Sequence, residues 1–334
     1  MRIDDLDLRL HDLGAKPVHR ERLLRAWTRG EPLVRARRND DLPAAVRAAL
    51  PVLQQAFDDI ARVRTRHPGA DGSERLLVEL TDGRSVEAVL LPRDGVCVSS
   101  QVGCAVGCTF CRTGQDGLTR HLGSAEMVAQ VVLARALRPV RKVVFMGMGE
   151  PAHNLDEVLA AIDLLGTLGD VPYKNLVLST VGDRRVFARL PAARVRPALA
   201  LSLHSLSPAV RATLLPRAPR LDPLELVALG EDYARATHYP IQYQWTLLAG
   251  VNDSDADADA IVHALRGKYA VMNFIPYNAV AGSDHRRPSP ERAFALTRRV
   301  NDGGVLAKLR DSAGQDVDAG CGQLRARVLR LAPA

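Results

Sequence analysis

The sequence predicts an α/β protein built on an incomplete (β/α)6 barrel, with a small helical domain before the barrel. From residue 96 onward, short apolar and β-branched runs alternate with longer helical patterns, and this alternation is typical of a parallel sheet. The chain has 334 residues, of which 47% are hydrophobic, so it can build one large domain and one small one.

Residues 1–66 are predicted to form an N-terminal helical domain. Apolar residues recur at helical spacing, and Pro51 suits the first turn of the third helix. The densest positive run of the chain, from Lys16 through Arg38, also lies here and contains few acids. Such a run fits either a solvated helical face or a module that docks RNA.

Residues 67–95 are predicted to form a β-hairpin extension. Two β-prone runs, Arg75 to Leu80 and Ser85 to Leu91, flank Thr81-Asp82-Gly83-Arg84. An Asp-Gly pair between such runs is a strong signal for a tight turn.

Residues 96–334 are predicted to form the partial barrel. The expected strands are Val96 to Ser99, Lys142 to Met146, Asn175 to Ser179, Ala198 to Leu203, Ile241 to Leu248 and Ala270 to Ile275. The expected helices between them include Glu126 to Leu137, Leu155 to Leu168, Pro223 to Ala236 and Asp255 to Leu265. Sites in such folds gather at the C-terminal ends of the strands, where several polar motifs of this chain fall.

Charge favours a polyanionic partner. The formal net charge is +7, and arginine, which suits bidentate contacts to phosphate, supplies most of the positive groups. No apolar stretch approaches the roughly 20 residues of a membrane helix. The chain opens MRIDDLDLRLHDLG without an apolar signal segment, so we expect a protein of the reducing cytoplasm.

Three of the five cysteines, Cys104, Cys108 and Cys111, form a C-x-x-x-C-x-x-C run. Three thiolates on one loop can ligate three irons of a [4Fe-4S] cluster and leave the fourth iron open to a small molecule. Structural zinc sites need four ligands, and no second Cys pair or nearby His follows. A disulfide is disfavoured in a reducing compartment. The spacing is the signature of radical S-adenosylmethionine (SAM) enzymes.

Most of residues 75–325 resembles one family, the RlmN/Cfr radical SAM methyltransferases, which methylate an amidine carbon of adenine in RNA. The resemblance rests on the cluster loop and on the runs Cys97-Val98-Ser99-Ser100-Gln101-Val102-Gly103, Gly114-Gln115-Asp116-Gly117-Leu118, Gly147-Met148-Gly149-Glu150-Pro151, Leu178-Ser179-Thr180, Ser202-Leu203-His204, Gly250-Val251-Asn252-Asp253 and Asp316-Val317-Asp318-Ala319-Gly320-Cys321-Gly322-Gln323-Leu324. Pro151 favours the branch that acts on carbon 2 over the branch that acts on carbon 8.

The resemblance implies one [4Fe-4S] cluster on Cys104, Cys108 and Cys111, and two SAM molecules per turnover. One SAM would methylate Cys321, whose two glycine neighbours suit a reactive loop thiol rather than a packed one. Cys97 would resolve a covalent RNA adduct by forming a transient disulfide with Cys321, and Glu87 would accept a proton. The implied SAM-binding residues are Gly149, Glu150, Ser179, Ser202, Leu203, His204 and Asn278.

The implied partners are ribosomal or transfer RNA and an electron donor such as flavodoxin or ferredoxin, with the chain acting as a monomer and without a membrane. Two alternatives stay open: a radical SAM enzyme that acts on a peptide or small molecule, and a metal-stabilised RNA-binding protein without catalysis. The chain departs from the family at Arg112 and at Pro216-Arg217-Ala218, where the family reads Pro-Ile-Asn, and its Lys16-Pro17-Val18-His19-Arg20 keeps only part of the family's pattern.

Overall fold

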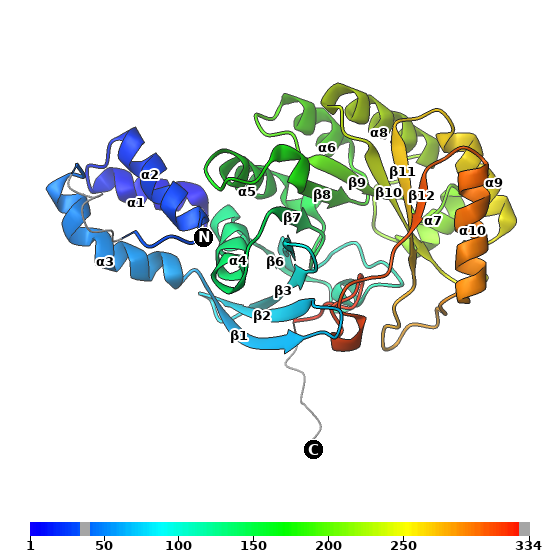
Figure 1. Ribbon diagram of the computed structural model, residues 1–334, viewed down its shortest axis with the longest axis horizontal. Coiled ribbons are helices and arrows are strands. Elements are labelled where there is room, and N and C mark those ends of the chain that lie inside the picture. The colour runs from blue at the N-terminus through cyan, green and yellow to red at the C-terminus, as the bar shows by residue number, and fades with distance from the viewer. Residues whose placement is uncertain (34–40, 327–334) are drawn as a thin grey trace, which may run out of the picture.

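The computed structural model describes residues 1–33 and 41–326, and one ten-stranded sheet organises them (Figure 1). The strand order is β1-β2-β3-β4-β7-β8-β9-β10-β11-β12. From β4 onward every neighbouring pair in this sheet is parallel. These strands are β4 (Gly95–Cys97), β7 (Lys142–Phe145), β8 (Leu176–Thr180), β9 (Ala198–Ser202), β10 (Ile241–Leu247), β11 (Ala270–Pro276) and β12 (Ala307–Leu309).

The parallel strands confirm the predicted partial barrel, because each of the six expected strands overlaps an observed one. The sheet ends in two free edges, β1 and β12, so it does not close. β12 is a further parallel strand that the sequence pattern did not reveal. The barrel helices are α4 (Ser124–Leu137), α5 (Leu155–Thr167), α6 (Arg184–Arg189), α7 (Pro208–Leu214), α8 (Pro223–Thr237), α9 (Asp255–Leu265) and α10 (Pro290–Asp302).

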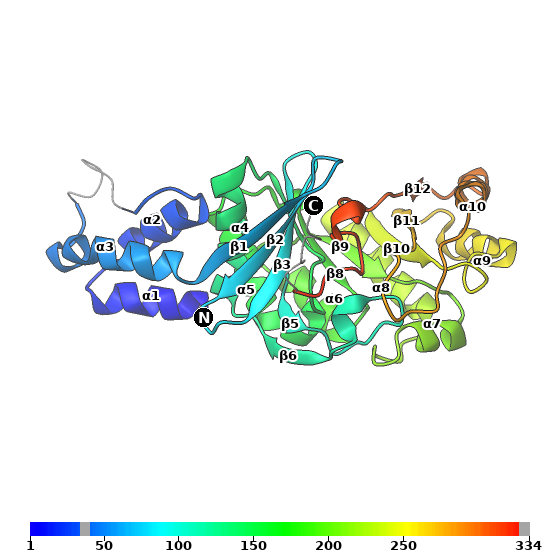
Figure 2. The ribbon, with the colours of Figure 1, turned by 90° about the horizontal axis from the view of Figure 1, so that it is seen from below.

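The N-terminal helices form a lobe at one end of the molecule (Figures 1 and 2). They are α1 (Ile3–Asp12), α2 (Pro17–Thr28) and α3 (Ala44–Asp58). Their buried apolar faces meet around Trp27 and Phe57, whose rings pack edge to face at 5.3 Å. The buried side chains of the lobe continue into the core of the sheet. Part of the positive run that begins at Lys16 lies outside the described residues.

The prediction of helix up to residue 66 is wrong, because α3 ends at Asp58 and β1 (Ala61–Pro68) follows. Arg62, Arg64 and Arg66 alternate with less exposed residues along this strand, which is the period of two that a strand requires. β1 pairs with β2 (Glu74–Leu80). The boundary placed at residue 66 therefore cuts through a strand.

The predicted hairpin is confirmed as β2 and β3 (Ser85–Leu91), which pair antiparallel. β3 also pairs with β4, so the hairpin belongs to the same sheet as the barrel. A separate two-stranded ribbon, β5 (Gln101–Gly103) with β6 (Leu118–His121), frames the cysteine loop between them.

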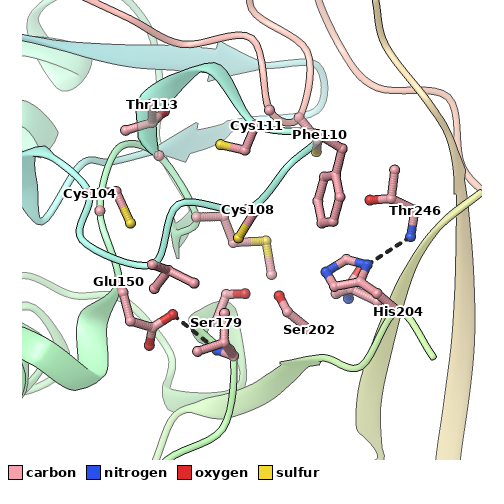
Figure 3. Close-up of a pocket in the computed structure, with 18 of the residues that line it drawn as sticks. Cys104, Cys108, Phe110, Cys111, Thr113, Glu150, Ser179, Ser202, His204 and Thr246 are labelled. Atoms are coloured by element: carbon pink, nitrogen blue, oxygen red, sulfur yellow. Dashed lines mark hydrogen bonds between the residues drawn. The ribbon is translucent and has the colours of Figure 1, made fainter. Parts of the chain in front are cut away.

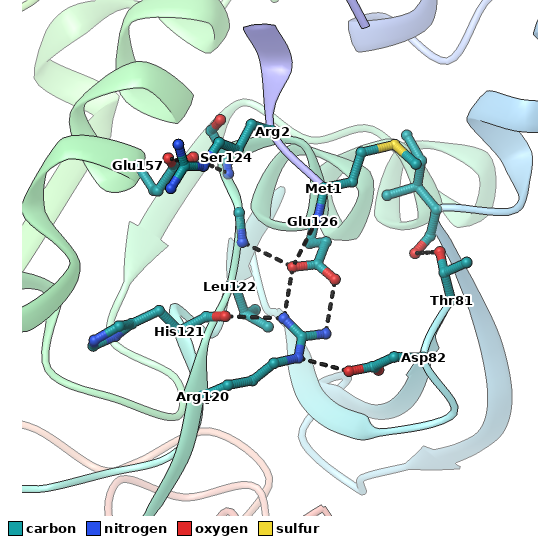
Figure 4. A network of polar contacts seen from close by, with 12 residues as sticks. Met1, Arg2, Thr81, Asp82, Arg120, His121, Leu122, Ser124, Glu126 and Glu157 are labelled. Atoms are coloured by element: carbon teal, nitrogen blue, oxygen red, sulfur yellow. Dashed lines mark hydrogen bonds and ion pairs between the residues drawn. The ribbon is translucent and has the colours of Figure 1, made fainter. Parts of the chain in front are cut away.

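A polar network joins the hairpin turn to the barrel (Figure 4). The Arg120 guanidinium donates to both oxygens of the buried Glu126 at 2.8 and 2.9 Å, and to Asp82 at 2.7 Å. Glu126 also accepts from the Gly123 N–H at 2.8 Å, which caps the start of α4. Because Arg120 lies on β6, the network fixes the ribbon that frames the cysteine loop.

None of the described helices is long and apolar enough to cross a membrane.

Candidate active site

The C-terminal ends of the parallel strands surround a cavity of about 870 Å³, measured out to its open mouth (Figure 3). Its walls bring together the three loop cysteines and several residues expected to bind SAM. The predicted residues that line it are Cys104, Cys108, Cys111, Gly149, Glu150, Ser179, Ser202, His204 and Cys321. A mostly apolar cavity with a few convergent polar groups is the usual form of a small-molecule site.

The loop from Cys104 to Cys111 turns its three thiols toward this cavity (Figure 3). Backbone hydrogen bonds hold the loop: the Cys104 N–H donates to Gly117 O at 3.0 Å and the Cys111 N–H donates to Cys108 O at 3.1 Å. Burial raises the pKa of Cys104 to about 12, and it also raises the pKa of Cys108 and of Cys111. In such buried surroundings the thiols stay protonated unless a cationic group lies beside them and stabilises the thiolates.

Three thiols from one loop match the number of protein ligands of a [4Fe-4S] cluster that keeps one iron open. Among residues 1–33 and 41–326, no three His, Cys, Asp or Glu side chains converge closely enough to hold one metal ion. Cys104, Cys108 and Cys111, which line one cavity from one loop, are the residues that would hold a [4Fe-4S] cluster.

The Gly147-to-Pro151 run forms the wall beside the cluster loop. A Cβ on Gly147 would lie 2.7 Å from Ser99 Oγ, and Gly149 adopts φ +106°, so both positions require glycine. Glu150 is 4% exposed, and burial raises its pKa. Its carboxylate accepts from Ala152 N at 3.0 Å, Thr180 Oγ1 at 2.6 Å and Val181 N at 3.0 Å. One acceptor position remains for an ammonium group such as that of SAM.

His204 has one defined donor toward the cavity. Its Nδ1 accepts a hydrogen bond from the Thr246 N–H at 3.0 Å, so the ring proton resides on Nε2. Burial, with a smaller effect of Arg211, lowers the pKa of His204 to about 3, so the ring is neutral. Phe110, from the cluster loop, packs on this ring with centroids 4.8 Å apart.

Asn252 positions His204, a role that the sequence did not reveal. Its Nδ2 donates to His204 O at 2.8 Å and to Thr246 O at 2.9 Å, while its Oδ1 accepts from Leu248 N at 2.8 Å. These bonds hold His204 at φ +58°, a conformation that non-glycine residues rarely adopt. The run from Gly250 to Asp253 stands out in the sequence, but no role for Asn252 follows from it.

The Cys321 segment closes over the cluster loop. The Arg112 N–H donates to Gly322 O at 2.6 Å, and Thr113 Oγ1 donates to Leu324 O at 2.7 Å. Asn278 lies beside this segment rather than on the cavity wall, and its Nδ2 donates to Cys321 O at 3.0 Å. Its Oδ1 is buried without a hydrogen-bond partner among the described residues.

Three further predicted residues, Leu203, Cys97 and Glu87, lie behind the cavity wall. Cys97 is the last residue of β4. Burial, and to a smaller extent the nearby Cys321, raises the pKa of Cys97 to about 12. Neither Cys97 nor Cys321 forms a disulfide. Glu87 is fully buried on β3, paired with Arg75, and its Oε2 accepts from the Arg325 N–H at 2.7 Å. Leu203 is a buried core residue.

The chain is similar to known proteins in sequence and in fold. The radical SAM superfamily profile matches residues 98–260. The chain is 67% identical to a protein named probable RNA methyltransferase from Aromatoleum aromaticum, over 98% of this chain and 93% of the relative. It is 64% identical to a protein of the same name from Stutzerimonas stutzeri, over 98% of this chain and 97% of the relative.

The chain belongs to the radical SAM RNA methyltransferase family. Its fold also matches the crystal structure of a radical SAM methyltransferase from Sphaerobacter thermophilus, with a TM-score of 0.84 and 34% identity over 98% of both chains. The predicted family and the predicted enzyme class are thereby confirmed.

Replacing any one of Cys104, Cys108 and Cys111 by alanine is expected to abolish cluster binding and SAM cleavage, because two thiolates cannot hold the cubane at three irons. Iron and sulfide content and the visible absorption of anaerobically reconstituted protein measure the first effect. Full iron content and SAM cleavage in any of the three variants would contradict this ligand assignment.

Proposed function

We propose that this chain methylates an adenine carbon of ribosomal or transfer RNA, with carbon 2 favoured over carbon 8, through a methyl group carried on Cys321. The observation that carries the proposal is the position of Cys321 on the wall of the cavity that the three cluster cysteines also line. A methyl group on this sulfur would project into the space where SAM is expected to bind.

An adenine carbon is a poor nucleophile, so it cannot take the methyl group of SAM by direct displacement. In the proposed path, Cys321 first accepts a methyl group from one SAM and loses its thiol proton. With the cluster and a second SAM bound, reductive cleavage of that SAM supplies a deoxyadenosyl radical. The S-methyl group of Cys321 would give a hydrogen atom to that radical, which becomes deoxyadenosine, and the methylene carbon left on the sulfur would add to the adenine ring.

The adduct next loses the ring proton, for which Glu87 is the proposed acceptor, and one electron, which would pass to the oxidised cluster that Cys104, Cys108 and Cys111 would hold. Both oxygens of Glu87 are engaged, Oε1 by Arg75 and Oε2 by the Arg325 N–H. Because Arg325 follows Cys321 by four residues, a movement of the Cys321 segment would free Oε2. Arg75, which is 1% exposed, holds the carboxylate in place during that movement.

Cys97 is the proposed resolving thiol. Its sulfur attacks the Cys321 sulfur, the new S–S bond replaces the S–C bond to RNA, and the released carbon takes up a proton. The pKa of about 12 means that Cys97 is protonated at rest, so attack requires loss of that proton as the adduct forms. An external thiol then reduces the disulfide.

The α1–α3 lobe is the proposed RNA-docking domain. Arg9 and Lys16 are exposed on it, and in the described part of the chain neither forms an ion pair. Truncation of the lobe is a poor test, because its buried side chains continue into the sheet core. Charge reversal at these two exposed positions keeps the core intact.

Cys97→Ala is expected to retain methylation of Cys321 and addition to adenine but to accumulate a covalent protein–RNA adduct, because the displacing thiol is missing. Cys321→Ala is expected to give neither methylated protein nor adduct. Denaturing gels with labelled RNA and intact-protein mass spectrometry separate the two outcomes. Methylated RNA from the Cys321 variant, or loss of activity without trapped RNA in the Cys97 variant, would refute these roles.

The double substitution Arg9→Glu with Lys16→Glu is expected to weaken binding of unmodified ribosomal and transfer RNA and to flatten its salt dependence. The log–log slope is expected to fall by up to about 0.9 for each phosphate that the variant no longer binds. The control is Arg298→Glu, an exposed residue on α10 at the other end of the molecule. Unchanged affinity and slope in the double variant, with wild-type folding, would show that the lobe is only structural.

A further inference from the structure

The outer face of the cluster loop is in contact with an exposed arginine, Arg217. A Cβ built on Gly107, in the middle of the loop, would lie 3.0 Å from Arg217 Nη2 and 3.4 Å from both Cζ and Nε. The guanidinium plane therefore lies against the Gly107 backbone. The Arg217 N–H also donates to Val106 O at 3.3 Å, so backbone and side chain both contact the loop.

Arg217 is exposed, and so is its neighbour Arg220. Within residues 1–33 and 41–326, neither guanidinium forms an ion pair; the Arg220 guanidinium donates only to Pro216 O at 3.3 Å. Both charges are therefore available to a partner. Most of the other arginines of this chain form ion pairs with Asp or Glu. In the described part of the chain, Arg217 and Arg220 do not belong to such a surface ion-pair network.

A groove lies beside these arginines, between α7 and the start of α8. Its walls are Pro208, Arg211, Ala212, Leu215, Ala218, Pro219, Arg220, Leu221 and Asp222. Asp222, which caps α8 by accepting from Leu224 N at 2.8 Å, is the one acidic residue on these walls, whereas Arg211 and Arg220 supply two positive groups. Arg211 is 4% exposed, donates to Val181 O and has a buried Nε without a partner among the described residues.

This surface and the Cys321 segment contact different ends of the cluster loop. Arg217 contacts Val106 and Gly107, whereas Gly322 contacts Phe110 and Arg112. RNA has to reach Cys321 at the second end. A partner on the Arg217 end would meet the cluster loop at Gly107 and Cys108, which are both partly exposed.

We propose that Arg217, Arg220 and the groove beside α7 are the docking surface for an acidic electron-transfer protein that carries a flavin or an iron–sulfur centre. The proposal rests on the proposed function, because reductive cleavage of SAM consumes one electron from outside the chain. The donor is oxidised by one electron, the cluster held by Cys104, Cys108 and Cys111 is reduced by one electron, and no bond or proton moves. Charge complementarity favours a protein donor with an acidic face.

The test measures cluster reduction in the reconstituted full-length protein without RNA, by stopped-flow absorbance. The probes are a reduced acidic flavodoxin and, separately, dithionite. The double substitution Arg217→Glu with Arg220→Glu is expected to lower the second-order rate constant with flavodoxin by about tenfold at low salt. The difference is expected to shrink at about 0.5 M salt, where exposed charges are screened. Reduction by dithionite and RNA affinity are expected to stay unchanged.

The matched control, Arg298→Glu, is expected to behave as the wild type with both reductants. An equal loss with dithionite would overturn the proposal and assign Arg217 to the cluster loop itself. Weaker RNA binding with normal reduction by flavodoxin would also overturn it and assign the surface to RNA. Because the readout needs no methylation, a failure of the proposed adenine chemistry would leave the reduction rates interpretable by themselves.

Discussion

The site depends on the contact by which the Cys321 segment closes on the cluster loop. The hydrogen bond from Arg112 N to Gly322 O, 2.6 Å long, joins two segments that are 210 positions apart in the chain. Thr113 and Asn278 reinforce this contact from either side. This contact holds the Cys321 sulfur, the proposed methyl carrier, on the wall of the cavity that Cys104, Cys108 and Cys111 also line. The barrel positions the cluster loop, and this contact positions Cys321 relative to that loop.

A second constraint acts from behind the wall. Ser99 Oγ donates to Glu87 O at 2.6 Å and accepts from Met148 N at 2.8 Å, so one hydroxyl ties the hairpin extension to the Gly147-to-Pro151 loop. Glu87 in turn accepts from Arg325 N, in the Cys321 segment. The hairpin is thereby coupled to both sides of the cavity, which explains why it is built into the barrel sheet instead of forming a separate module.

Much of this could be predicted from the sequence, because the signals were local. The strand–helix alternation located all six expected barrel strands, and Asp-Gly located the hairpin. β1 was missed because charged residues alternate along it, so apolar periodicity gave no signal. The Arg75–Glu87 pair depends on strand register, and Asn252 and Arg217 act on residues 48 and 110 positions away. Long-range contacts of this kind leave no pattern in a single sequence.

The most direct test of the carrier path counts deuterium in the product. The protein is supplied with SAM whose methyl group carries three deuterium atoms, together with unmodified RNA, and the methylated adenosine is analysed by mass spectrometry. Transfer through Cys321 removes one deuterium atom before the carbon adds to adenine and later replaces it with a proton. The account therefore predicts a methyl group with two deuterium atoms and one hydrogen. A methyl group that retains all three deuterium atoms would contradict it, because the group would have been transferred intact.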